Sequence, residues 1–476
     1  MIKKTWGKVQ KLIPNKIIRN ILIVLIIYNA YIYTNFYFEA FQNNRIKRVF
    51  TAPQIKAPSH GDTVLIVAPH PDDETLGPGG YIKKAVKNGA KVYVVLMTYG
   101  DGYKIAAETE QGFNGKPESL IRFGKKRRLE TIDALTSLGV DRDHIWFLGF
   151  PDRGISPMWI RYWKNLYRSP LTKVTDAPYP TSYIPHIPYM GKKVFDVLSE
   201  IIEKIEPNII FLPSPFDFHV DHWSTYSFSI AAILNLIEKR KMSIPAIYTY
   251  LVHYKNFPYP KGYYPKGALL PPKDMSIYKT RWRSYDITDV EKDKKEAILK
   301  YKTQLIFLKR LLLSFVRTNE LWGEVPEFSL ENEEMVEIPD LLTDVLVDYM
   351  DTGANIRYMD IERLRTGVKI SIVVQKSVSK KYIYHVRFFI LRKEGYIRGT
   401  IFYNRKTGEK TMVFGEDGRE VKLSGIKATF QRNVISIVLP IPQGANRILL
   451  GCDTNLAGKS RWLYIDTTGE FIINLQ

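Results

Sequence analysis

Short apolar runs alternate with segments of helical spacing through the first two thirds of the chain. Four runs have the length and β-branched content of buried strands: Thr63–Ala68, Lys91–Met97, His144–Phe150 and Asn208–Pro213. Apolar positions recurring about every 3.6 residues predict helices among and after them: Tyr81–Gly89, Glu118–Leu138, Lys193–Ile205, His222–Arg240 and a stretch over Val290–Phe315. This alternation predicts an α/β domain with a mainly parallel sheet layered with helices. Ligands bind such sheets at the carboxyl ends of the strands.

The pattern changes from about residue 345 onward. Strand-length apolar or alternating runs follow one another without a helix: Val368–Lys376, Tyr382–Leu391, Tyr396–Asn404, Asn433–Ile441 and Arg447–Cys452. They predict a smaller all-β, sandwich-like accessory domain over residues 345–476, joined to the first domain by an acidic linker over residues 326–344. This region contains no obvious catalytic constellation.

Residues 151–189 interrupt the strand–helix alternation with scattered aromatic residues and prolines. Long loops of this kind in compact domains are usually functional or disordered, and the aromatic content disfavours disorder. Two interpretations stand side by side. The rings form platforms that stack on sugar rings, or the loop simply packs its own aromatic side chains.

The amino-terminal segment predicts a membrane anchor. Ile21–Phe38 is a nearly charge-free apolar run long enough to cross a bilayer, with tyrosine and phenylalanine at its far end. Cationic residues precede it and stay on the cytoplasmic side, so the rest of the chain is expected outside. We therefore expect a basic tail and anchor over residues 1–42, an uncleaved single-pass span, and a stalk over residues 43–62. A cleavable signal peptide is the alternative, disfavoured by the length of the apolar run.

The amino-acid composition limits the classes of binding partner that the protein is expected to have. The chain has 476 residues and a formal net charge of +20, so its surface attracts polyanions such as nucleic acid, anionic lipid or an acidic envelope polymer. No nucleic-acid-binding motif accompanies the charge, and we expect no nucleic-acid partner. The single cysteine, Cys452, excludes a disulfide-stapled module.

Two polar turns carry the candidate chemistry, and each directly follows a predicted strand. The first reads His70-Pro71-Asp72-Asp73-Glu74, whose three carboxylates repel one another unless a cation lies among them. The alternative to a metal site is that this turn is simply the solvated start of a helix, capped by one of the aspartates. The second turn, residues 217–222, ends in His222 and favours the metal interpretation. His70, Asp73 and His222 would form a two-histidine, one-carboxylate site with an open position for water.

Together these motifs resemble the PIG-L/LmbE-like N-acetylglucosamine deacetylases. The (A/P)HPDDE motif of that family corresponds to residues 69–74, and its HxDH motif to residues 219–222. The pair, in this order after two predicted strands, is specific, whereas neither motif is specific alone. The resemblance covers about residues 63–323 and implies a Rossmann-like, PIG-L-like deacetylase domain, which we place at residues 63–325.

Carried onto matching positions, the resemblance implies His70, Asp73 and His222 as zinc ligands and Asp72 as the general base. The implied reaction removes the acetyl group from an N-acetylglucosamine-type sugar in a glycan or glycolipid. A metal lowers the pKa of its water and polarises the acetamide carbonyl, while a free carboxylate takes the proton. The same ligand set also accepts iron(II).

Further roles follow from this chemistry. His219, if protonated, could serve as the acid for the departing amine and as a partner of the oxyanion. Asp221 is expected to orient His222 or His219 from behind the ligands. Arg127 and Asp152 are candidates for holding sugar hydroxyls. Some family members carry a tyrosine where this chain has Asp217, so an extra oxyanion donor is missing there.

Two competing functions remain to be weighed. A catalytically inactive, glycan-binding envelope protein could keep the fold, but intact ligands and an intact Asp72 argue against it. A non-haem iron oxygenase could use the same triad, but such enzymes usually adopt a β-barrel, and the alternation here is α/β. The leading hypothesis is a membrane-anchored, metal-dependent deacetylase acting on an extracytoplasmic glycan.

Overall fold

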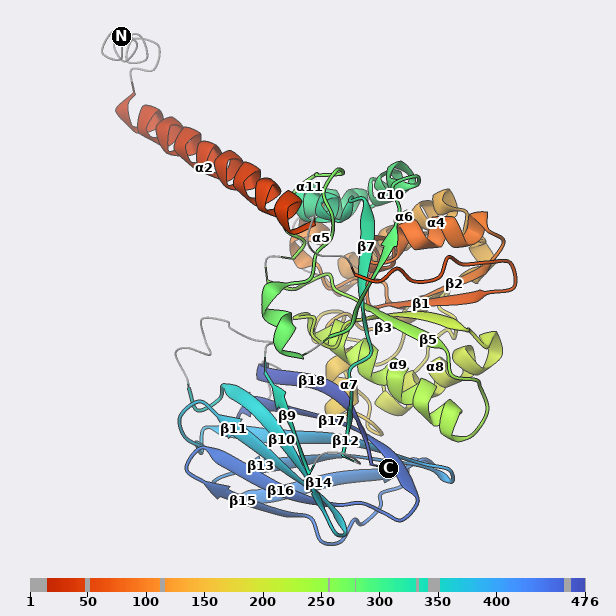
Figure 1. Cartoon of the computed structure of the whole chain (residues 1–476), viewed down its shortest axis with the longest axis vertical. Coiled ribbons are helices and arrows are strands. Elements are labelled where there is room, and N and C mark those ends of the chain that lie inside the picture. The colour runs from red at the N-terminus through yellow and green to blue at the C-terminus, as the bar shows by residue number, and fades with distance from the viewer. Residues whose placement is uncertain are drawn as a thin grey trace.

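The computed structural model describes most of the chain, and its first domain is built around one mixed sheet. The described residues are 15–47, 52–111, 116–255, 257–278, 280–330, 334–340, 352–457 and 464–475. The sheet has the strand order β3-β2-β1-β4-β5-β7-β6 (Figure 1). Its strands are β1 (Thr63–Ala68), β2 (Lys91–Thr98), β3 (Ile145–Phe150), β4 (Ile209–Pro213), β5 (Ala246–Tyr250), β6 (Trp282–Asp286) and β7 (Asn319–Glu324).

Five of these strands run parallel, which confirms the predicted fold class. β1 lies at the centre, with Ile66 paired to Val94 of β2 on one side and to Phe211 of β4 on the other. β7 and β6 add an antiparallel edge beyond β5. Every residue of β1 after Thr63 is buried, because helices cover both faces of the sheet.

The covering helices form one layer on each face (Figure 1). One layer contains α4 (Gly79–Lys87), α6 (Pro117–Leu138) and α10 (Glu291–Ile298), which contact one another; the other contains α7 (Ile155–Ile160), α8 (Gly191–Ile205) and α9 (Val220–Glu238). The short helix α3 (Asp73–Leu76) follows β1. Two further helices, α5 (Lys104–Gln111) and α11 (Lys302–Leu312), contact each other. The stretch expected as one helix over Val290–Phe315 is thus divided into α10, α11 and a short 3₁₀ turn.

The carboxyl-terminal region forms two antiparallel-rich sheets, as the sandwich prediction requires. One sheet has the order β15-β16-β11-β10-β9, and the other β14-β13-β12-β17-β18-β8. The strands are β8 (Glu327–Ser329), β9 (Met335–Pro339), β10 (Ile356–Leu364), β11 (Gly367–Val374), β12 (Tyr382–Arg392), β13 (Gly395–Asn404), β14 (Gly408–Gly415), β15 (Lys427–Gln431), β16 (Val434–Pro440), β17 (Ala445–Leu456) and β18 (Tyr464–Asn474).

The expected linker over residues 326–344 is wrong where the structure describes it. β8 pairs in parallel with β18, and β9 pairs with β10, so both strands belong to the carboxyl-terminal sheets. The reason is long-range pairing: Phe328 lies opposite Ile473, and no local pattern reveals such a partner. The rest of the expected linker, residues 341–344, lies outside the described residues.

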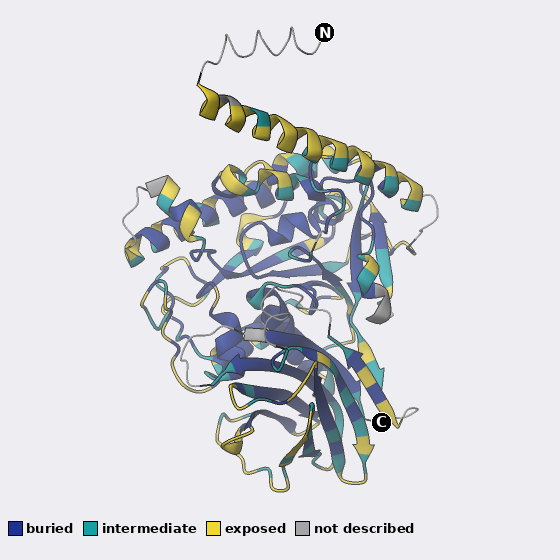
Figure 2. Cartoon of the chain, turned by 90° about the vertical axis from the view of Figure 1, so that its left-hand side faces the viewer, coloured by how far each residue is buried: buried dark blue, intermediate teal, exposed yellow. Residues whose placement is uncertain are grey.

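The helix α2 (Lys16–Lys47) extends well beyond the expected span of residues 21–38. By length and composition it could cross a membrane, a test that a signal sequence also passes, and its most apolar window is fully outside the protein core. Its carboxyl end is docked, because the Asn43 side chain donates to the carbonyl oxygens of Tyr259 and Ala268 at 2.9 Å each. Figure 2 shows that most of the helix surface is exposed, and Figure 1 shows the helix projecting from the first domain at its carboxyl end.

The expected stalk over residues 43–62 is also wrong in its described part. Ile55 is buried, and its backbone N–H donates to the carbonyl oxygen of Ser284 on β6 at 3.0 Å. Ala52 is buried as well. The segment therefore packs against the first domain, since backbone pairing and apolar burial hold it there. The cations expected to set the orientation before Lys16 lie outside the described residues.

The aromatic segment over residues 151–189 is mostly core. Trp159, Trp163, Tyr167, Tyr179 and Tyr189 are all at most 2% exposed, so they cannot stack on a ligand at the surface. Trp159 lies parallel to Phe389 of β12 at 6.1 Å between ring centroids, which places it between the two domains. Of the two interpretations, the structure supports packing, and the packing includes the β region.

Candidate metal centre

The first polar turn places its side chains at the carboxyl end of the central strand. His70 and Asp72 follow β1, and Asp73 begins α3; all three are at most 7% exposed. Asp72 has φ 111° and ψ −31°, a backbone conformation that residues other than glycine rarely adopt. Backbone strain of this kind concentrates at functional sites. The turn directs adjacent aspartates to different partners.

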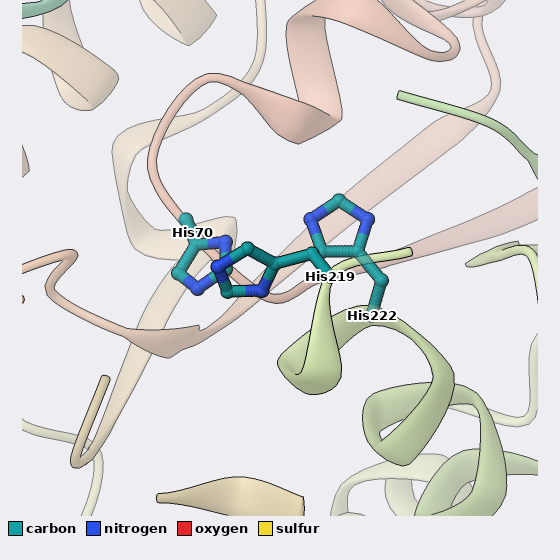
Figure 3. Close-up of side chains that lie close together, drawn as sticks. All are labelled: His70, His219 and His222. Carbon is teal, nitrogen blue, oxygen red and sulfur yellow. The ribbon is translucent and has the colours of Figure 1, made fainter. Parts of the chain in front are cut away.

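The carboxylate of Asp73 is the point where the two turns meet. Its Oδ2 atom lies 3.2 Å from His70 Nδ1 and 3.1 Å from His222 Nε2. His219 joins the same cluster, with its ring centroid 4.6 Å from that of His70 (Figure 3). The structure thus brings together the three expected ligands, from strand ends that are far apart in sequence and adjacent in the sheet.

The second turn is the amino-terminal end of α9. His219 caps this helix, because its Nδ1 atom accepts from the backbone N–H of Asp221 at 3.2 Å. His222, one turn along, is fully buried. Its Nδ1 atom lies 3.0 Å from Asp217 Oδ2, so a carboxylate fixes the ring while Nε2 faces Asp73.

Asp221 does not take the place expected for it behind His222 or His219. Its Oδ2 atom lies 3.1 Å from His70 Nε2 and accepts from the backbone N–H of Arg153 at 2.6 Å. Asp221 is the second residue of α9 and points across to the neighbouring strand end, while Asp217 comes before the helix and lies beside His222. Asp217 therefore takes the place beside His222 that was expected for Asp221, and Asp221 lies beside His70 instead.

Among the described residues, three overlapping groups of side chains could hold an ion. They are His70 with His219 and His222, Asp73 with His222 and His253, and His70 with Asp152 and Asp221. Each group has its ligand atoms within 4.8 Å of one another, and none of the three contains the whole expected triad. The first group shares His222 with the second and His70 with the third, and both histidines lie within 3.2 Å of Asp73 Oδ2.

His253 was missed by the sequence reasoning. Its ring centroid lies 4.9 Å from that of His222, and it comes shortly after β5, another parallel strand. The rule that drew attention to the other histidines, a polar residue beyond the carboxyl end of a strand, would have found it. The strand itself was not predicted, because Ala246–Tyr250 is only five residues long and is exposed at its start.

The donor set fits a cation. Asp73 Oδ1 is buried and has no hydrogen-bond partner among the described residues, and neither ring nitrogen of His222 completes a well-directed hydrogen bond. Buried polar atoms without partners are costly, and imidazole with carboxylate suits zinc or iron. Burial lowers the pKa of His222, but Asp217 and Asp73 outweigh it and raise that pKa to about 9. The carboxylates thus favour positive charge at this position.

The Asp72 carboxylate lies beside the Arg127 guanidinium. The Arg127 guanidinium lies 3.6 Å from Asp72 Oδ2 and donates to the carbonyl oxygens of Gly100 at 2.8 Å and Pro71 at 2.5 Å. Burial raises the pKa of Asp72 well above its usual range, against the opposing effect of Arg127. Arg127 is 4% exposed, so it holds this turn rather than a sugar hydroxyl, contrary to the expectation.

Asp152 reaches the site from the loop after β3. Its Oδ2 atom accepts from the backbone N–H of Gly102 at 3.0 Å, and its Oδ1 atom lies 3.9 Å from His70 Nε2. Burial, with Asp152 nearby, raises the pKa of Asp101 to about 7, and Asp101 accepts from the Tyr179 hydroxyl at 2.6 Å. Asp152 thus lies close to a ligand and is already engaged by backbone.

A mainly parallel α/β sheet with histidines and carboxylates gathered at its carboxyl edge defines an α/β protein with a candidate metal centre. Residues 65–233 match the PIG-L family, described as GlcNAc-PI de-N-acetylase. This match includes both polar turns and confirms the family resemblance over that part of the chain.

The chain is also similar to curated deacetylases. It is 28% identical over 188 residues to a 1D-myo-inositol 2-acetamido-2-deoxy-alpha-D-glucopyranoside deacetylase of Mycobacterium sp. (strain KMS), covering 39% of this chain and 53% of that protein. It is 27% identical over 162 residues to a diacetylchitobiose deacetylase of Thermococcus kodakarensis, covering 33% and 46%. The chain thus spans about half the length of these relatives.

Among solved structures, the chain is similar to an N,N'-diacetylchitobiose deacetylase from Pyrococcus horikoshii in complex with an inhibitor. The identity is 22%, the TM-score is 0.36, and the alignment covers 56% of this chain and 84% of the other. The relatives that match by sequence are deacetylases of N-acetylated sugars. None of these alignments extends over the whole of the present chain.

Proposed function

We propose that the chain is a metal-dependent hydrolase that removes the N-acetyl group from an N-acetylglucosamine-type sugar in an extracytoplasmic glycan or glycolipid. The observation that carries this proposal is the meeting of His70 Nδ1 and His222 Nε2 at Asp73 Oδ2, with Asp72 adjacent. The deacetylase relatives support the substrate class. Amide hydrolysis needs an activated water and a proton carrier, and both kinds of group are present.

His70, Asp73 and His222 would hold the ion, with Zn²⁺ preferred and Fe²⁺ also suited to the donors. When bound, a divalent cation supplies a Lewis acid that acidifies water and polarises an acetamide carbonyl. Asp217 and Asp221 fix the two ligand imidazoles through their other ring nitrogens. Such outer carboxylates set ring orientation and basicity.

Asp72 would take the proton from the attacking water. Its backbone strain and its contact with Arg127 hold the carboxylate beside the ligand Asp73 without making it a ligand. Burial raises its pKa, which strengthens it as a base, while Arg127 favours the ionised form that must accept the proton. The same carboxyl can then pass the proton to the departing amine.

His219 would meet the developing oxyanion. Its Nδ1 atom accepts a backbone hydrogen bond, so a neutral ring carries its proton on Nε2. Burial and the neighbouring histidines lower the pKa of His219 well below its ordinary value. We therefore infer that it acts first as a neutral hydrogen-bond donor, and serves as an acid only after gaining a proton during the reaction.

The amino-terminal helix would anchor this enzyme in a membrane, with the catalytic domain on the outer side. Its length and apolar composition support the anchor, and the cations that precede the apolar run support the orientation. An alkaline phosphatase fused to the carboxyl terminus should be active in cells, and a fluorescent protein that matures only in the cytoplasm should be dark. The reverse pair of signals would overturn the orientation.

The activity is tested by acetate release from N-acetylglucosamine oligomers by the purified full chain, after chelation and after zinc is restored. Asp72→Asn should lower the rate by roughly 10²- to 10⁴-fold, the usual contribution of a general base, and should still bind zinc. Asp133→Asn, an exposed aspartate on α6, is the matched control and should retain full activity. If Asp72→Asn releases acetate at the control rate, the assigned base is wrong. Oligomer binding without acetate release under any metal would favour the inactive glycan-binding alternative.

A further inference from the structure

Three large apolar side chains stand exposed on neighbouring helices beside the metal centre. Ile105 on α5 is 59% exposed, and Ile306 and Phe307 on α11 are 50% and 45% exposed. The two helices contact each other, and the Tyr103 ring at the start of α5 meets the Phe307 ring edge-on at 6.4 Å. We name Ile105, Ile306 and Phe307 the α5–α11 patch. Clustered exposed apolar side chains mark interaction surfaces, whereas single ones do not.

The patch borders the candidate site through Tyr103 and α6. Glu130 accepts from the backbone N–H of Thr303 at 3.0 Å and from its hydroxyl at 2.6 Å, which fixes the start of α11. Glu130 lies one turn after Arg127 on α6, and Arg127 lies 3.6 Å from Asp72. Tyr103 is close enough to Arg127 and Asp72 for both charges to act on its pKa, which burial raises. The patch is therefore linked to the proposed base, Asp72, through Glu130 and Arg127 of α6 and through Tyr103.

The charges on α11 beside the patch are positive, whereas α5 carries both Lys104 and Glu108. Lys302, Lys309 and Arg310 are exposed on α11, and Lys104 is exposed next to Ile105. The sequence of α11 contains no acidic residue. A helix face that mixes apolar side chains with cations and lacks carboxylates has the composition of segments that lie in the interface of an anionic bilayer.

The same face is continuous with the docked end of α2. The Phe36 ring of α2 and the Arg310 side chain of α11 both lie beside Gly262, within 4 Å of the place that a side chain there would take. Arg310 also donates to the carbonyl oxygen of Lys261 at 3.3 Å. Figure 1 shows α2 leaving the first domain beside α11 and α5. A bilayer crossed by α2 would therefore lie near this part of the domain.

We propose that the α5–α11 patch is a second membrane contact, which rests in the interface of an anionic bilayer and holds the catalytic domain against the lipid surface. This inference rests on the proposed anchoring by α2. It adds a peripheral contact made by the catalytic domain itself. Ile105, Ile306 and Phe307 enter the interface, and Lys302, Lys309 and Arg310 meet the anionic headgroups.

Single-cysteine labelling of the full chain tests the contact, because the native Cys452 is fully buried. An environment-sensitive fluorophore is attached to Phe307→Cys, to Leu25→Cys on α2, and to Ile244→Cys. Ile244 is 78% exposed and precedes β5, so it lies at the amino edge of the sheet, opposite the metal centre. Each protein is reconstituted in nanodiscs of phosphatidylcholine and phosphatidylglycerol, with and without a quencher attached to the lipid.

The lipid quencher should reduce the emission of the probes at positions 25 and 307 by at least about threefold more than that of the probe at position 244. The probe at position 307 should lie less deep in the bilayer than the probe at position 25. If the Leu25 probe is in water, the anchoring proposal fails. If the Leu25 probe is in lipid while the Phe307 probe behaves like Ile244, only the second contact is overturned. A Phe307 probe shielded in a concentration-dependent manner, without lipid quenching, would instead show that a second copy covers the patch, and would also overturn the contact.

The charge requirement is tested by a paired substitution in the labelled protein. Lys302→Gln with Lys309→Gln should reduce quenching at Phe307 in nanodiscs containing phosphatidylglycerol, and should leave it unchanged in phosphatidylcholine alone. Lys239→Gln with Lys241→Gln, on the opposite edge after α9, is the matched control and should change neither. Equal quenching in both lipids for all variants would overturn the anionic preference.

Discussion

Asp217 shows how much of the candidate site depends on single contacts that residue type does not reveal. Its carboxylate accepts from three backbone N–H groups, those of His219 at 3.0 Å and of Val252 and His253 at 2.9 Å each. It also lies 3.0 Å from His222 Nδ1. Burial opposes its ionisation, but His222 outweighs burial and lowers the pKa of Asp217. The residue therefore orients a ligand and joins the ends of β4 and β5.

We predict that Asp217→Asn weakens zinc binding by roughly 10- to 100-fold, the usual loss when the outer partner of a ligand histidine is replaced. An amide provides one acceptor oxygen, so His222 loses its negative partner while the turn keeps part of its backbone hydrogen bonding. Competition with a fluorescent chelator measures the affinity.

The matched control for this substitution is Asp176→Asn. Asp176 forms a similar pair with His186 at 3.1 Å on the protein surface, and neither residue belongs to the candidate metal groups of the described residues. Zinc affinity should be unchanged there. A loss of equal size in both variants would show that Asp217 has no special role.

At the scale of elements, the local pattern identifies strands and helices that carry their own signal, and misses those defined by distant partners. β1, β2, β3 and β4 were predicted within one or two residues, because each is a continuous buried apolar run. β8 has only three residues and depends on β18 for its pairing. The antiparallel edge β6–β7 was missed because Trp282–Asp286 is partly polar and exposed, so its period gives no clear signal.

The pairing of β9 with β10 sets a pH dependence. Asp360 lies opposite Glu337 in this pair, and burial together with Glu337 raises the pKa of Asp360 to about 6. A folded pKa above the unfolded value of about 3.9 means that folding favours the protonated form. This contribution to stability is fully present below about pH 4 and is lost as the pH rises through about 6.

We therefore predict that Asp360→Asn stabilises the chain at pH 7.5 by about 0.5 kcal/mol, after allowance for solvent screening of a partly exposed pair, and has less effect at pH 4.5. Urea unfolding at both pH values measures the difference. Glu337→Gln should produce part of the same gain. An Asp360→Asn protein with the same difference from wild type at both pH values would contradict the assignment.

At the scale of the whole molecule, a buried ionic network joins the two domains behind the metal centre. Glu470 on β18 accepts from the Trp159 indole N–H at 2.8 Å and from the Ser227 hydroxyl of α9 at 2.6 Å. Arg387 pairs with both Glu470 and Asp453. Its guanidinium lies 4.9 Å from the ring of Trp223, the residue that directly follows His222. The β region thus supports the helix that carries two candidate site histidines.

We predict that Glu470→Gln lowers the free energy of unfolding by about 3 kcal/mol, because it removes one partner from a fully buried ionic network. Glu416→Gln is the matched control. Glu416 also reaches α9, through Lys239, but that pair is partly exposed and should contribute less than about 1 kcal/mol. Guanidinium unfolding followed by tryptophan fluorescence measures both. Equal effects would show that the two domains are not coupled through Glu470.

From the sequence, the two turns that form the candidate site could be predicted, but the contacts between their side chains could not. His70, Asp73 and His222 were correctly expected to meet, because both motifs follow parallel strands whose carboxyl ends share one edge. The contact of Asp217 with His222 and of Asp221 with His70, and the use of Arg127 to hold the turn, could not be foreseen. Both depend on side-chain directions fixed by the packing of α6 and α9 against the sheet.

The position of Glu470 late in the chain has a consequence for the order of folding during synthesis. The carboxylate that satisfies Ser227 and Trp159 is made 243 residues after Ser227. At roughly 5–20 residues per second, the ribosome leaves the aromatic face of α7 and α9 uncovered for on the order of ten to fifty seconds. During that interval the nascent first domain presents Trp159 and Trp163 without their eventual cover. The chain would need a holding chaperone most at this stage, on the side of the membrane where the first domain emerges.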